Sequence, residues 1–207
     1  LPEKYYIKNK FPDREEAGTP NILGAITLGT TIHVLNKIGM ENVLKEDSEL
    51  KPINPYGNTK ATIEKLLFDI ACCKGDNDII QKSNSGWKIA RLRYFNPVGA
   101  HPSGKIGESP QGIPTNLFPY ITQVAIGKRD FLQIFGDNWP TKDGTGVRDY
   151  IHIMDLAEGH CDALEFLLNS DPILLTLNLG TGKGTSVFEV IQTFESIINK
   201  EIPYKIF

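Results

Sequence analysis

Five stretches of the chain place apolar residues three or four positions apart, which is the spacing of one helix face. They are residues 20–38, 54–73, 114–127, 155–168 and 187–198, and each is predicted to form a helix. In the second of these helices, the apolar stripe expected to face the core consists of Ile63, Leu66, Leu67 and Ile70.

Two of the helices begin with residues that can cap each other. Asp155 precedes Glu158 by three positions, and Ser186 precedes Glu189 by the same distance. In such a pair the first side chain accepts a bond from a backbone N–H of the first turn, and the second side chain reaches back to the cap. We therefore expect helices to open at Asp155 and at Ser186.

Shorter runs between the helices predict strands. The clearest is residues 86–99, which ends in a loop rich in Asn, Pro and Gly and alternates through Ile89, Leu92 and Tyr94. Further strands are expected at residues 131–136 and 174–180, and a glycine-rich loop at 141–146 leads into a short extended segment. Strands that alternate with helices predict an α/β fold.

The composition narrows the class of protein. The 207-residue chain is 40% hydrophobic and carries a formal net charge of −3. Such a small, dispersed charge argues against a nucleic-acid or polybasic membrane partner. Three cysteines are too few for a disulfide framework or a zinc site, so we expect reduced thiols and a cytoplasmic protein. No apolar run approaches the ~20 residues of a spanning helix, and the start at Leu1 leads us to expect a fragment of a longer protein.

Residues 54–60, Asn-Pro-Tyr-Gly-Asn-Thr-Lys, are the first candidate for chemistry. On a helix, Tyr56 and Lys60 lie one turn apart on the same face. An ammonium beside a phenol favours the phenolate, which can take a proton from a sugar hydroxyl while a nicotinamide takes the hydride. Spacing alone favours an ordinary helix surface, because any helix with Tyr and Lys four apart matches.

Two other motifs have both a functional and a structural interpretation. Residues 93–99, Arg-Tyr-Phe-Asn-Pro-Val-Gly, end a predicted strand, where open α/β sheets place ligands, but a strand that ends in a Pro-Gly turn has the same sequence. Arg148 stands beside a glycine-rich backbone and is suited to clamp phosphate oxygens. The alternative for Arg148 is a solvated side chain on a flexible loop.

Neither the glycines of residues 178–186 nor the histidines have the spacing that a dinucleotide-binding turn or a metal site requires. Residues 178–186 lead from a strand through glycines to a helix, yet Gly180, Gly182 and Gly184 follow GxGxG rather than GxGxxG. We expect a strand-to-helix connection there, with a helix N-terminus able to face a phosphate. The four histidines are scattered, so no metal site is predicted.

The order of the motifs is more specific than any one of them. Residues 49–207 contain, in this order, NPYGNTK, RLRYFNPVGAHPSGKIGESPQGIPTNLFPYITQVAIGKR, QIFGDNWPTKDGTGVRDYIHIMDLAEGH and NLGTGKGTSVFEV. This part of the chain resembles the UDP-glucose 4-epimerases, which are extended short-chain dehydrogenases/reductases. The resemblance implies tightly bound NAD, UDP-glucose and UDP-galactose as substrates, and a possible homodimer.

The resemblance also implies roles for individual residues. Tyr56 would take the proton of the sugar 4-hydroxyl while hydride leaves C4 for the nicotinamide, and the 4-keto sugar would rotate and receive the hydride on its other face. Lys60 would hold the nicotinamide ribose, and Tyr94 would lie near the cofactor. The implied substrate contacts are Phe95 and Asn96 at the border of the substrate, Asn116 and Leu117 near the phosphates, Gln133 and Phe135 beside the uracil, and Arg148 at the diphosphate.

Parts of the family pattern have no match in this chain. The opening strand and GxxGxxG turn that cradle the NAD pyrophosphate are not found, and Thr30 and Thr31 lie in a predicted helix rather than at the strand end that carries the family's sugar-orienting Ser/Thr. We therefore expect a partial Rossmann-like fold that lacks the NAD-binding half and retains part of the substrate domain. For the 207-residue chain we expect neither retained NAD nor turnover.

Residues 1–48 resemble another family. The string REEAGTPNILGAITLGTTIHVLNKIGMENV is similar to a segment of class V aminotransferases and cysteine desulfurases, which use pyridoxal phosphate, and Thr19 matches a threonine near the cofactor phosphate. We expect a chimera, natural or from sequence assembly, joined between Val43 and Leu50. Three interpretations remain open: an NAD-dependent epimerase, a pyridoxal-phosphate enzyme, and a non-catalytic remnant of an epimerase substrate lobe.

Overall fold

The computed structural model describes residues 45–52, 54–74 and 79–207. The helix expected at residues 20–38, with Thr30 and Thr31, and the segment around Thr19 lie outside the described residues. Within the described part, no helix has both the length and the apolar run needed to span a bilayer.

The described part is an α/β protein, as the alternation of patterns predicts. Its helices are α2 (Pro55–Ala71), α3 (Leu117–Ala125), α4 (Ile153–Asn169) and α5 (Val187–Ile198). Its strands are β1 (Ile80–Lys82), β2 (Ile89–Tyr94), β3 (Asn96–Val98), β4 (Leu132–Ile134), β5 (Val147–His152), β6 (Ile173–Leu179), β7 (Gly184–Ser186) and β8 (Tyr204–Ile206). The strands β1, β7 and β8, three residues each, were not predicted, because so short a run carries no readable period.

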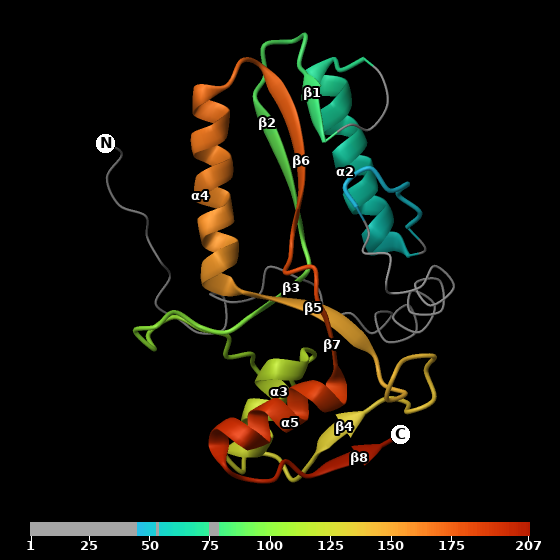
Figure 1. Cartoon of the computed structure of the whole chain (residues 1–207), viewed down its shortest axis with the longest axis vertical. Helices are drawn as coiled ribbons and strands as arrows, with labels where there is room; N and C mark the ends of the chain where they lie inside the picture. The colour runs from blue at the N-terminus through green and yellow to red at the C-terminus, as the bar shows by residue number, and fades with distance from the viewer. Residues whose placement is uncertain (1–44, 53, 75–78) are drawn as a thin grey trace.

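The upper layer is a three-stranded sheet of order β1-β6-β2. β2 runs parallel to β6, with Arg93 opposite Asn178, and β1 runs antiparallel to β6. Helix α4 covers one face of this sheet and α2 covers the other (Figure 1). Since side chains alternate along a strand, Arg91 and Arg93 face α2, whereas Tyr94 faces α4.

The lower lobe packs α3 and α5 against the parallel pair β4–β8 (Figure 1). Its core is aliphatic and comes from α3, β4, α5 and the segment before β8: Ile121, Val124, Leu132, Ile134, Val190, Ile191 and Ile202. The ladder β3-β5-β7 lies between this lobe and the upper layer, with β3 parallel and β7 antiparallel to β5.

The prediction that an apolar stripe of α2 faces the core is wrong for three of the four residues in that stripe. Ile63, Leu66 and Ile70 are 49%, 56% and 40% exposed, and only Leu67 is partly buried. The face that meets the sheet carries Ala61, Glu64, Phe68 and Ala71 instead. Two alanines let the helix approach closely and Glu64 pairs with arginines of β2, so the less hydrophobic face is the buried one.

The predicted helix starts are confirmed at Ser186 and wrong at Asp155. The Ser186 hydroxyl accepts from the Glu189 N–H at 3.1 Å, and the Ser186 N–H donates to Glu189 Oε2 at 2.8 Å. Helix α4 starts at Ile153, two residues before Asp155, because β5 runs directly into it and His152 supplies the cap. The His152 Nδ1 atom accepts from the Met154 N–H at 3.2 Å.

Candidate functional site

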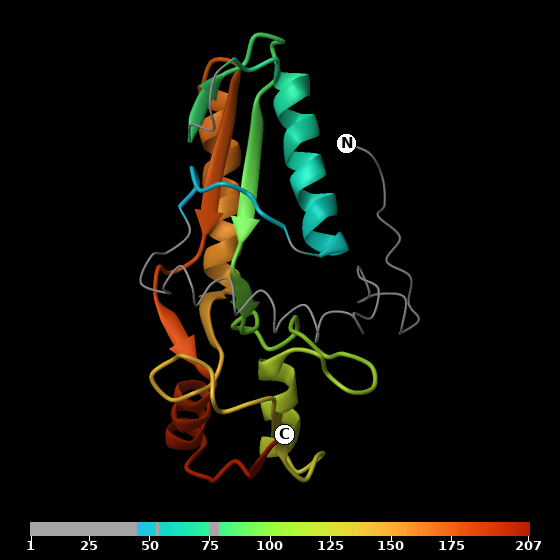
Figure 2. The same cartoon turned by 90° about the vertical axis from the view of Figure 1, so that its right-hand side faces the viewer.

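The candidate site lies where the upper layer meets the lower lobe. In both views the N-terminal end of α2 and the C-terminal end of β2 are at the same end of the sheet (Figures 1 and 2). The helix begins there because the Asn54 side chain accepts from the Gly57 N–H at 2.6 Å and Pro55 occupies the first turn. The candidate residues of α2 and those that follow β2 therefore lie at the same end of the sheet.

Tyr56 and Lys60 share one exposed face of α2, as their spacing predicts. The Lys60 Nζ atom lies 5.1 Å from the centroid of the Tyr56 ring, and Tyr56 is 66% exposed. Tyr56 is therefore not buried among the other apolar residues of the helix, and both polar atoms can reach a ligand. A phenol next to an ammonium is an arrangement suited to proton transfer.

Tyr94 lies on the opposite face of the sheet from α2. Its hydroxyl is 2.7 Å from His160 Nε2, and His160 Nδ1 is 2.7 Å from the Leu156 carbonyl. Because a carbonyl only accepts, Nδ1 donates to Leu156, and Nε2 shares a hydrogen bond with the Tyr94 hydroxyl. The structure therefore separates Tyr94 from Tyr56 and ties it to α4.

Phe95 packs against the glycine turn that follows β6. The Phe95 N–H donates to the Leu179 carbonyl at 3.0 Å. A Cβ atom added to Gly180 would lie 2.5 Å from Phe95 Cδ2, so this close approach requires glycine. Asp149 fixes the turn, since its carboxylate accepts from the Thr181 N–H, the Thr181 hydroxyl and the Gly182 N–H at 2.7–2.9 Å.

These contacts correct the expectation that the α5 N-terminus can face a phosphate. Three donors there are already bonded within the chain: the Ser186 N–H donates to the Glu189 carboxylate, the Glu189 N–H to the Ser186 hydroxyl, and the Ser186 hydroxyl to the Asp143 carboxylate. The turn at Thr181 and Gly182 is likewise taken by Asp149. A phosphate would meet negative charge at both places.

Arg148 is a half-buried cation on β5. Its Nη1 atom donates to the Val147 carbonyl at 2.7 Å, and among the described residues it has no carboxylate within ion-pair distance. Burial lowers the pKa of Arg148, and the neighbouring Tyr150 opposes that shift. Arginine nevertheless stays protonated in proteins, so a desolvated charge remains for an anionic ligand to neutralise.

Asn96 lies beside the strand that carries Arg148. In the β3–β5 ladder Asn96 is opposite Tyr150, two residues after Arg148. The Phe118 ring packs at 5.2 Å from the Tyr150 ring, which connects this strand to the first turn of α3. The structure thus brings Asn96, Arg148 and the start of α3 into one region.

The start of α3 holds the two residues predicted near the phosphates. Asn116 is the N-cap of α3, but its side chain makes no capping bond; its Nδ2 atom donates to Glu108 Oε1 at 2.9 Å. Leu117 packs against the aliphatic core of the lower lobe. Asn116 is therefore at the surface, and Leu117 anchors the helix.

The two residues predicted beside the uracil lie at β4. Gln133 is within the strand, opposite Lys205 of β8. Phe135 follows the strand, is 73% exposed, and lies 6.3 Å from the Phe207 ring. An exposed ring of this kind offers a flat surface for stacking.

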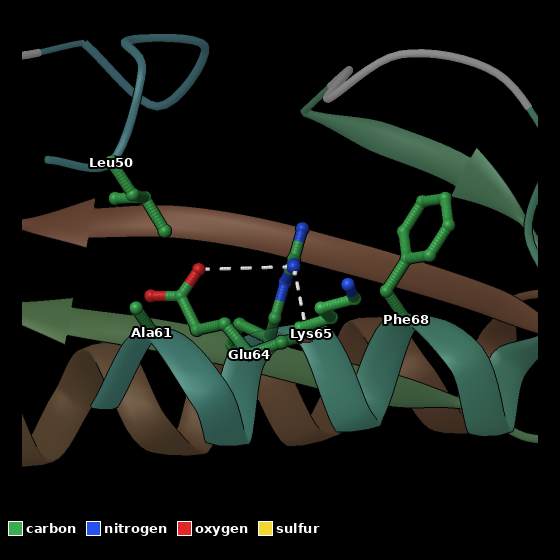
Figure 3. Close-up of a pocket in the computed structure, with 6 residues that line it drawn as sticks. Leu50, Ala61, Glu64, Lys65 and Phe68 are labelled. Atoms are coloured by element: carbon green, nitrogen blue, oxygen red, sulfur yellow. Dashed lines mark hydrogen bonds and ion pairs between the residues drawn. The ribbon is translucent and has the colours of Figure 1, made fainter. Parts of the chain in front are cut away.

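A polar cluster that was not predicted from the sequence joins α2 to the sheet. Glu64 pairs with Arg93 at 2.6 Å. Glu64 also approaches the Arg91 Nη1 atom at 3.7 Å, one of the contacts drawn as dashed lines in Figure 3. Beside it lies a cavity of about 240 Å³ lined by Leu50, Ala61, Glu64, Lys65, Phe68 and Arg91. The signal was present in the strand itself, because two arginines two positions apart share one face of a strand and need partners.

Six of the candidate residues thus form two separate groups. Tyr56 and Lys60 form the first group, and Phe95, Asn96, Arg148 and Asn116 surround the junction with the lower lobe. Among the described residues, no hydrogen bond or ring contact joins Tyr56 or Lys60 to Phe95 or Asn96. A ligand that spans both groups would have to bridge the junction.

Comparisons with known proteins agree on the relatives of this chain. It is 54% identical over 162 residues to the UDP-glucose 4-epimerase of Bacillus subtilis, which covers 78% of this chain and 44% of that protein. It is 46% identical over 199 residues to UDP-glucose 4-epimerase 2 of Arabidopsis thaliana, covering 88% and 53%. The chain therefore spans about half the length of the curated relatives it matches.

Solved structures give the same result. The UDP-glucose 4-epimerase from Stenotrophomonas maltophila, crystallised with NAD and formylated UDP-arabinopyranose, superposes with a TM-score of 0.72 at 48% identity over 80% of this chain and 46% of that one. The Bifidobacterium longum enzyme, solved with NAD+ and UDP, gives 0.69 at 43% identity over 79% and 46%. These coverages agree with a partial Rossmann-like fold.

Family models match two parts of the sequence. Residues 2–54 match the class-V aminotransferase model, in agreement with the resemblance of the N-terminal segment. Residues 36–175 match the model of the NAD dependent epimerase/dehydratase family. The chain, by its longer match, its relatives and its fold, belongs to the NAD-dependent epimerase/dehydratase family.

Proposed function

We propose that this chain supplies the proton-transfer pair and the UDP-sugar contacts of a cytoplasmic UDP-glucose 4-epimerase in galactose metabolism. One observation carries the proposal: the exposed Tyr56–Lys60 pair lies at the end of the sheet where β2 runs toward the strand of Arg148. The names of the relatives support this reaction. The net charge of −3 favours neither nucleic acid nor a membrane as a partner.

In the proposed reaction Tyr56 handles the proton. Its phenolate takes the proton of the sugar 4-hydroxyl. The Tyr56 hydroxyl formed in this way returns the proton to the sugar oxygen when the 4-keto sugar is reduced on its other face. The Lys60 Nζ atom, 5.1 Å from the centroid of the Tyr56 ring, places a positive charge beside the ring that carries the reacting hydroxyl. NAD in the complete family enzyme supplies the hydride acceptor and donor at C4.

The rest of the substrate would be held on the lower side of the junction. Arg148 neutralises the diphosphate, and Asn116 and Leu117 at the start of α3 approach it. Gln133 and Phe135 lie beside the uracil, and Phe95 and Asn96 border the sugar. The desolvated, unneutralised charge of Arg148 supports this assignment, because a diphosphate accepts two parallel bonds from a guanidinium.

The described residues fit only one end of the dinucleotide. Tyr56 and Lys60 can face the nicotinamide ribose, with Tyr94 farther along on the α4 face. The glycine turn after β6 does not fit the pyrophosphate, because Asp149 already accepts from its N–H groups. We therefore propose that the 207-residue chain binds a UDP-sugar without retaining NAD and without turnover.

A second copy of the chain is proposed as the partner of the outer face of α2. Thr59, Ile63, Leu66 and Ile70 alternate four and three positions apart and are exposed, which is the pattern of a helix–helix seam. Replacing Leu66 with Glu should convert a dimer to a monomer in sedimentation equilibrium. The exposed Lys128→Gln control should leave the mass unchanged.

Calorimetric titration of the 207-residue chain with UDP tests the proposed binding. We expect measurable affinity that Arg148→Gln lowers at least about tenfold, in keeping with the loss of a charge-assisted bond to phosphate. The control Lys128→Gln changes an exposed cation that follows α3 and should bind as the unmodified chain does. Equal affinities of the two variants would contradict the role of Arg148.

A further inference from the structure

The Glu64 carboxylate receives a two-pronged bond from Arg93. Arg93 Nε donates to Oε1 at 2.8 Å, and Nη2 donates to Oε2 at 2.6 Å. The side chains of Arg93 and Glu64 are 20% and 17% exposed, so little water competes for these bonds. A bidentate pair fixes direction as well as distance, because both nitrogen atoms must meet both oxygen atoms.

Arg91 reinforces the attachment of the same helix. Its Nη1 atom donates to the Glu64 carbonyl at 3.3 Å and lies 3.7 Å from Oε2 (Figure 3). Its other nitrogen atoms, Nε and Nη2, donate to the Thr176 hydroxyl of β6 at 3.0 and 2.6 Å. Glu64 is therefore anchored to two arginines, and one of these is itself held by the centre of the sheet.

Arg93 also connects the pair to the segment before α2. Its Nη1 atom donates to the Glu46 carbonyl at 2.9 Å. The Glu46 carboxylate in turn accepts from the Asn178 N–H of β6 at 2.9 Å. One arginine thus joins α2, β2 and the segment 45–51, and that segment is attached to β6.

The N-terminal half of α2 has little apolar attachment of its own. The apolar cluster on this side of the sheet contains Phe68 and Ala71, which are both in the C-terminal half of the helix. The cavity of about 240 Å³ adjoins Ala61 and Glu64, between the helix and Leu50 (Figure 3). Glu64, just past the middle of this 17-residue helix, is therefore the polar attachment to the sheet that lies nearest to the N-terminal half.

The position of the pair connects it to the candidate site. Glu64 lies one turn beyond Lys60 and two turns beyond Tyr56, or ~6 and ~12 Å along the helix axis. Arg93 precedes Tyr94 and Phe95 at the end of β2. We propose that Glu64 and Arg93 are positioning residues, whose ion pair fixes Tyr56 and Lys60 relative to the end of β2.

This inference rests on the proposed function, so its test has an arm that needs no ligand. In the full 207-residue chain with Cys72→Ser, spin labels on Asn58→Cys and on the exposed Cys161 of α4 report the distance from the N-terminal half of α2 across the sheet. A second sample with Asp69→Cys in place of Asn58→Cys reports the C-terminal half. Glu64→Gln and the milder Arg93→Lys are compared with the exposed neighbour Lys65→Gln.

We expect Glu64→Gln to broaden the distance distribution of the Asn58–Cys161 pair about twofold and to leave that of the Asp69–Cys161 pair unchanged. Arg93→Lys should broaden the Asn58–Cys161 distribution less, since lysine keeps the positive charge and loses only the bidentate geometry of the guanidinium. Lys65→Gln should change neither. An unchanged Asn58–Cys161 distribution in Glu64→Gln, or equal broadening of both pairs, would overturn the proposal.

The second arm compares the affinities of the chain for UDP and UDP-glucose. A positioning role predicts that Glu64→Gln removes the preference for UDP-glucose and leaves the affinity for UDP unchanged, whereas general unfolding would weaken both. A retained preference in a folded Glu64→Gln chain would overturn the functional role of the pair. Absence of any UDP-glucose binding by the unmodified chain would contradict the proposed function, and the distances would still decide whether the pair positions α2.

Discussion

The upper layer and the lower lobe of this molecule are held together in different ways. The lower lobe encloses seven buried aliphatic side chains from α3, β4, α5 and the segment before β8. In the upper layer, α2 meets the sheet with alanines, Phe68 and a charged residue, and its more apolar stripe faces outward. The lobe that holds the predicted diphosphate and uracil contacts is therefore stabilised by apolar burial, and the helix with the proton-transfer pair is attached by polar bonds.

The difference has a consequence for the site. Apolar packing is dense and tolerates little displacement, whereas attachment through a few directed bonds can be lost by one substitution. We expect changes in the lower core to affect the stability of the fold, and changes at Glu64 to affect the placement of Tyr56.

The largest loss of stability is expected in the lower core. Ile121 is fully buried, so Ile121→Ala should lower the free energy of unfolding by roughly 2–5 kcal/mol, measured by urea denaturation. Ile63→Ala removes the same atoms from the exposed stripe of α2. This substitution should change the free energy of unfolding by less than about 0.5 kcal/mol in a monomeric sample. Similar losses at the two positions would show that the outer stripe of α2 is covered.

A smaller loss is expected at the polar interface of α2. Glu64→Gln leaves Arg93 and Arg91 without their partner and should lower the free energy of unfolding by roughly 1–3 kcal/mol. The matched control is the exposed pair Lys51–Glu49, 2.8 Å apart with side chains 71% and 76% exposed. Glu49→Gln should have no measurable effect, because exposed pairs contribute little.

The smallest effect is a dependence of stability on pH at Asp143. Burial alone would raise the pKa of Asp143, but bonds from Ser186 and Thr145 outweigh it and hold the pKa below its ordinary value of 3.8. A carboxyl whose pKa is depressed by folding stabilises the protein above its unfolded pKa, and this contribution is lost as the pH falls through the folded value. Stability should therefore decline below about pH 4, and Asp143→Asn should be less stable at pH 7 by roughly 1 kcal/mol.

Measuring unfolding of both proteins between pH 3 and pH 7 checks the sign. The difference between Asp143→Asn and the unmodified chain should shrink as the pH falls, because protonation makes the two side chains alike in charge. A difference that stays constant over this range would show that the Asp143 charge has no role in anchoring the 137–146 loop to α5.

Much of the fold was predictable because its helices and longer strands have clear periods and caps. The α5 start follows from Ser186 and Glu189 alone, and the Tyr56–Lys60 face follows from their spacing. The buried face of α2 was not predictable in the same way, since hydrophobicity ranks Ile63 and Leu66 above Ala61 and Glu64. That choice depends on Arg91 and Arg93 of a strand some thirty residues away, which a local pattern does not contain.

The candidate site shows the same limit. The motifs indicate Arg148 and Asn96, but only the β3–β5 register brings them together. The glycines after β6 suggested a helix N-terminus open to phosphate, whereas Asp149, more than thirty positions earlier, fills the turn. A carboxylate that arrives from a distant strand cannot be anticipated from the turn sequence itself.

Turnover by a hybrid enzyme would show whether Tyr56 of this chain acts in the epimerase reaction. The matched 162 residues of the Bacillus subtilis UDP-glucose 4-epimerase, 54% identical, are replaced by their equivalents from this chain, and formation of UDP-glucose from UDP-galactose is measured by a coupled assay. We predict turnover that Tyr56→Phe reduces at least about 100-fold, as expected for loss of a general acid–base group. A folded hybrid that contains NAD but does not turn over, or that is equally active with Phe at position 56, would contradict the account.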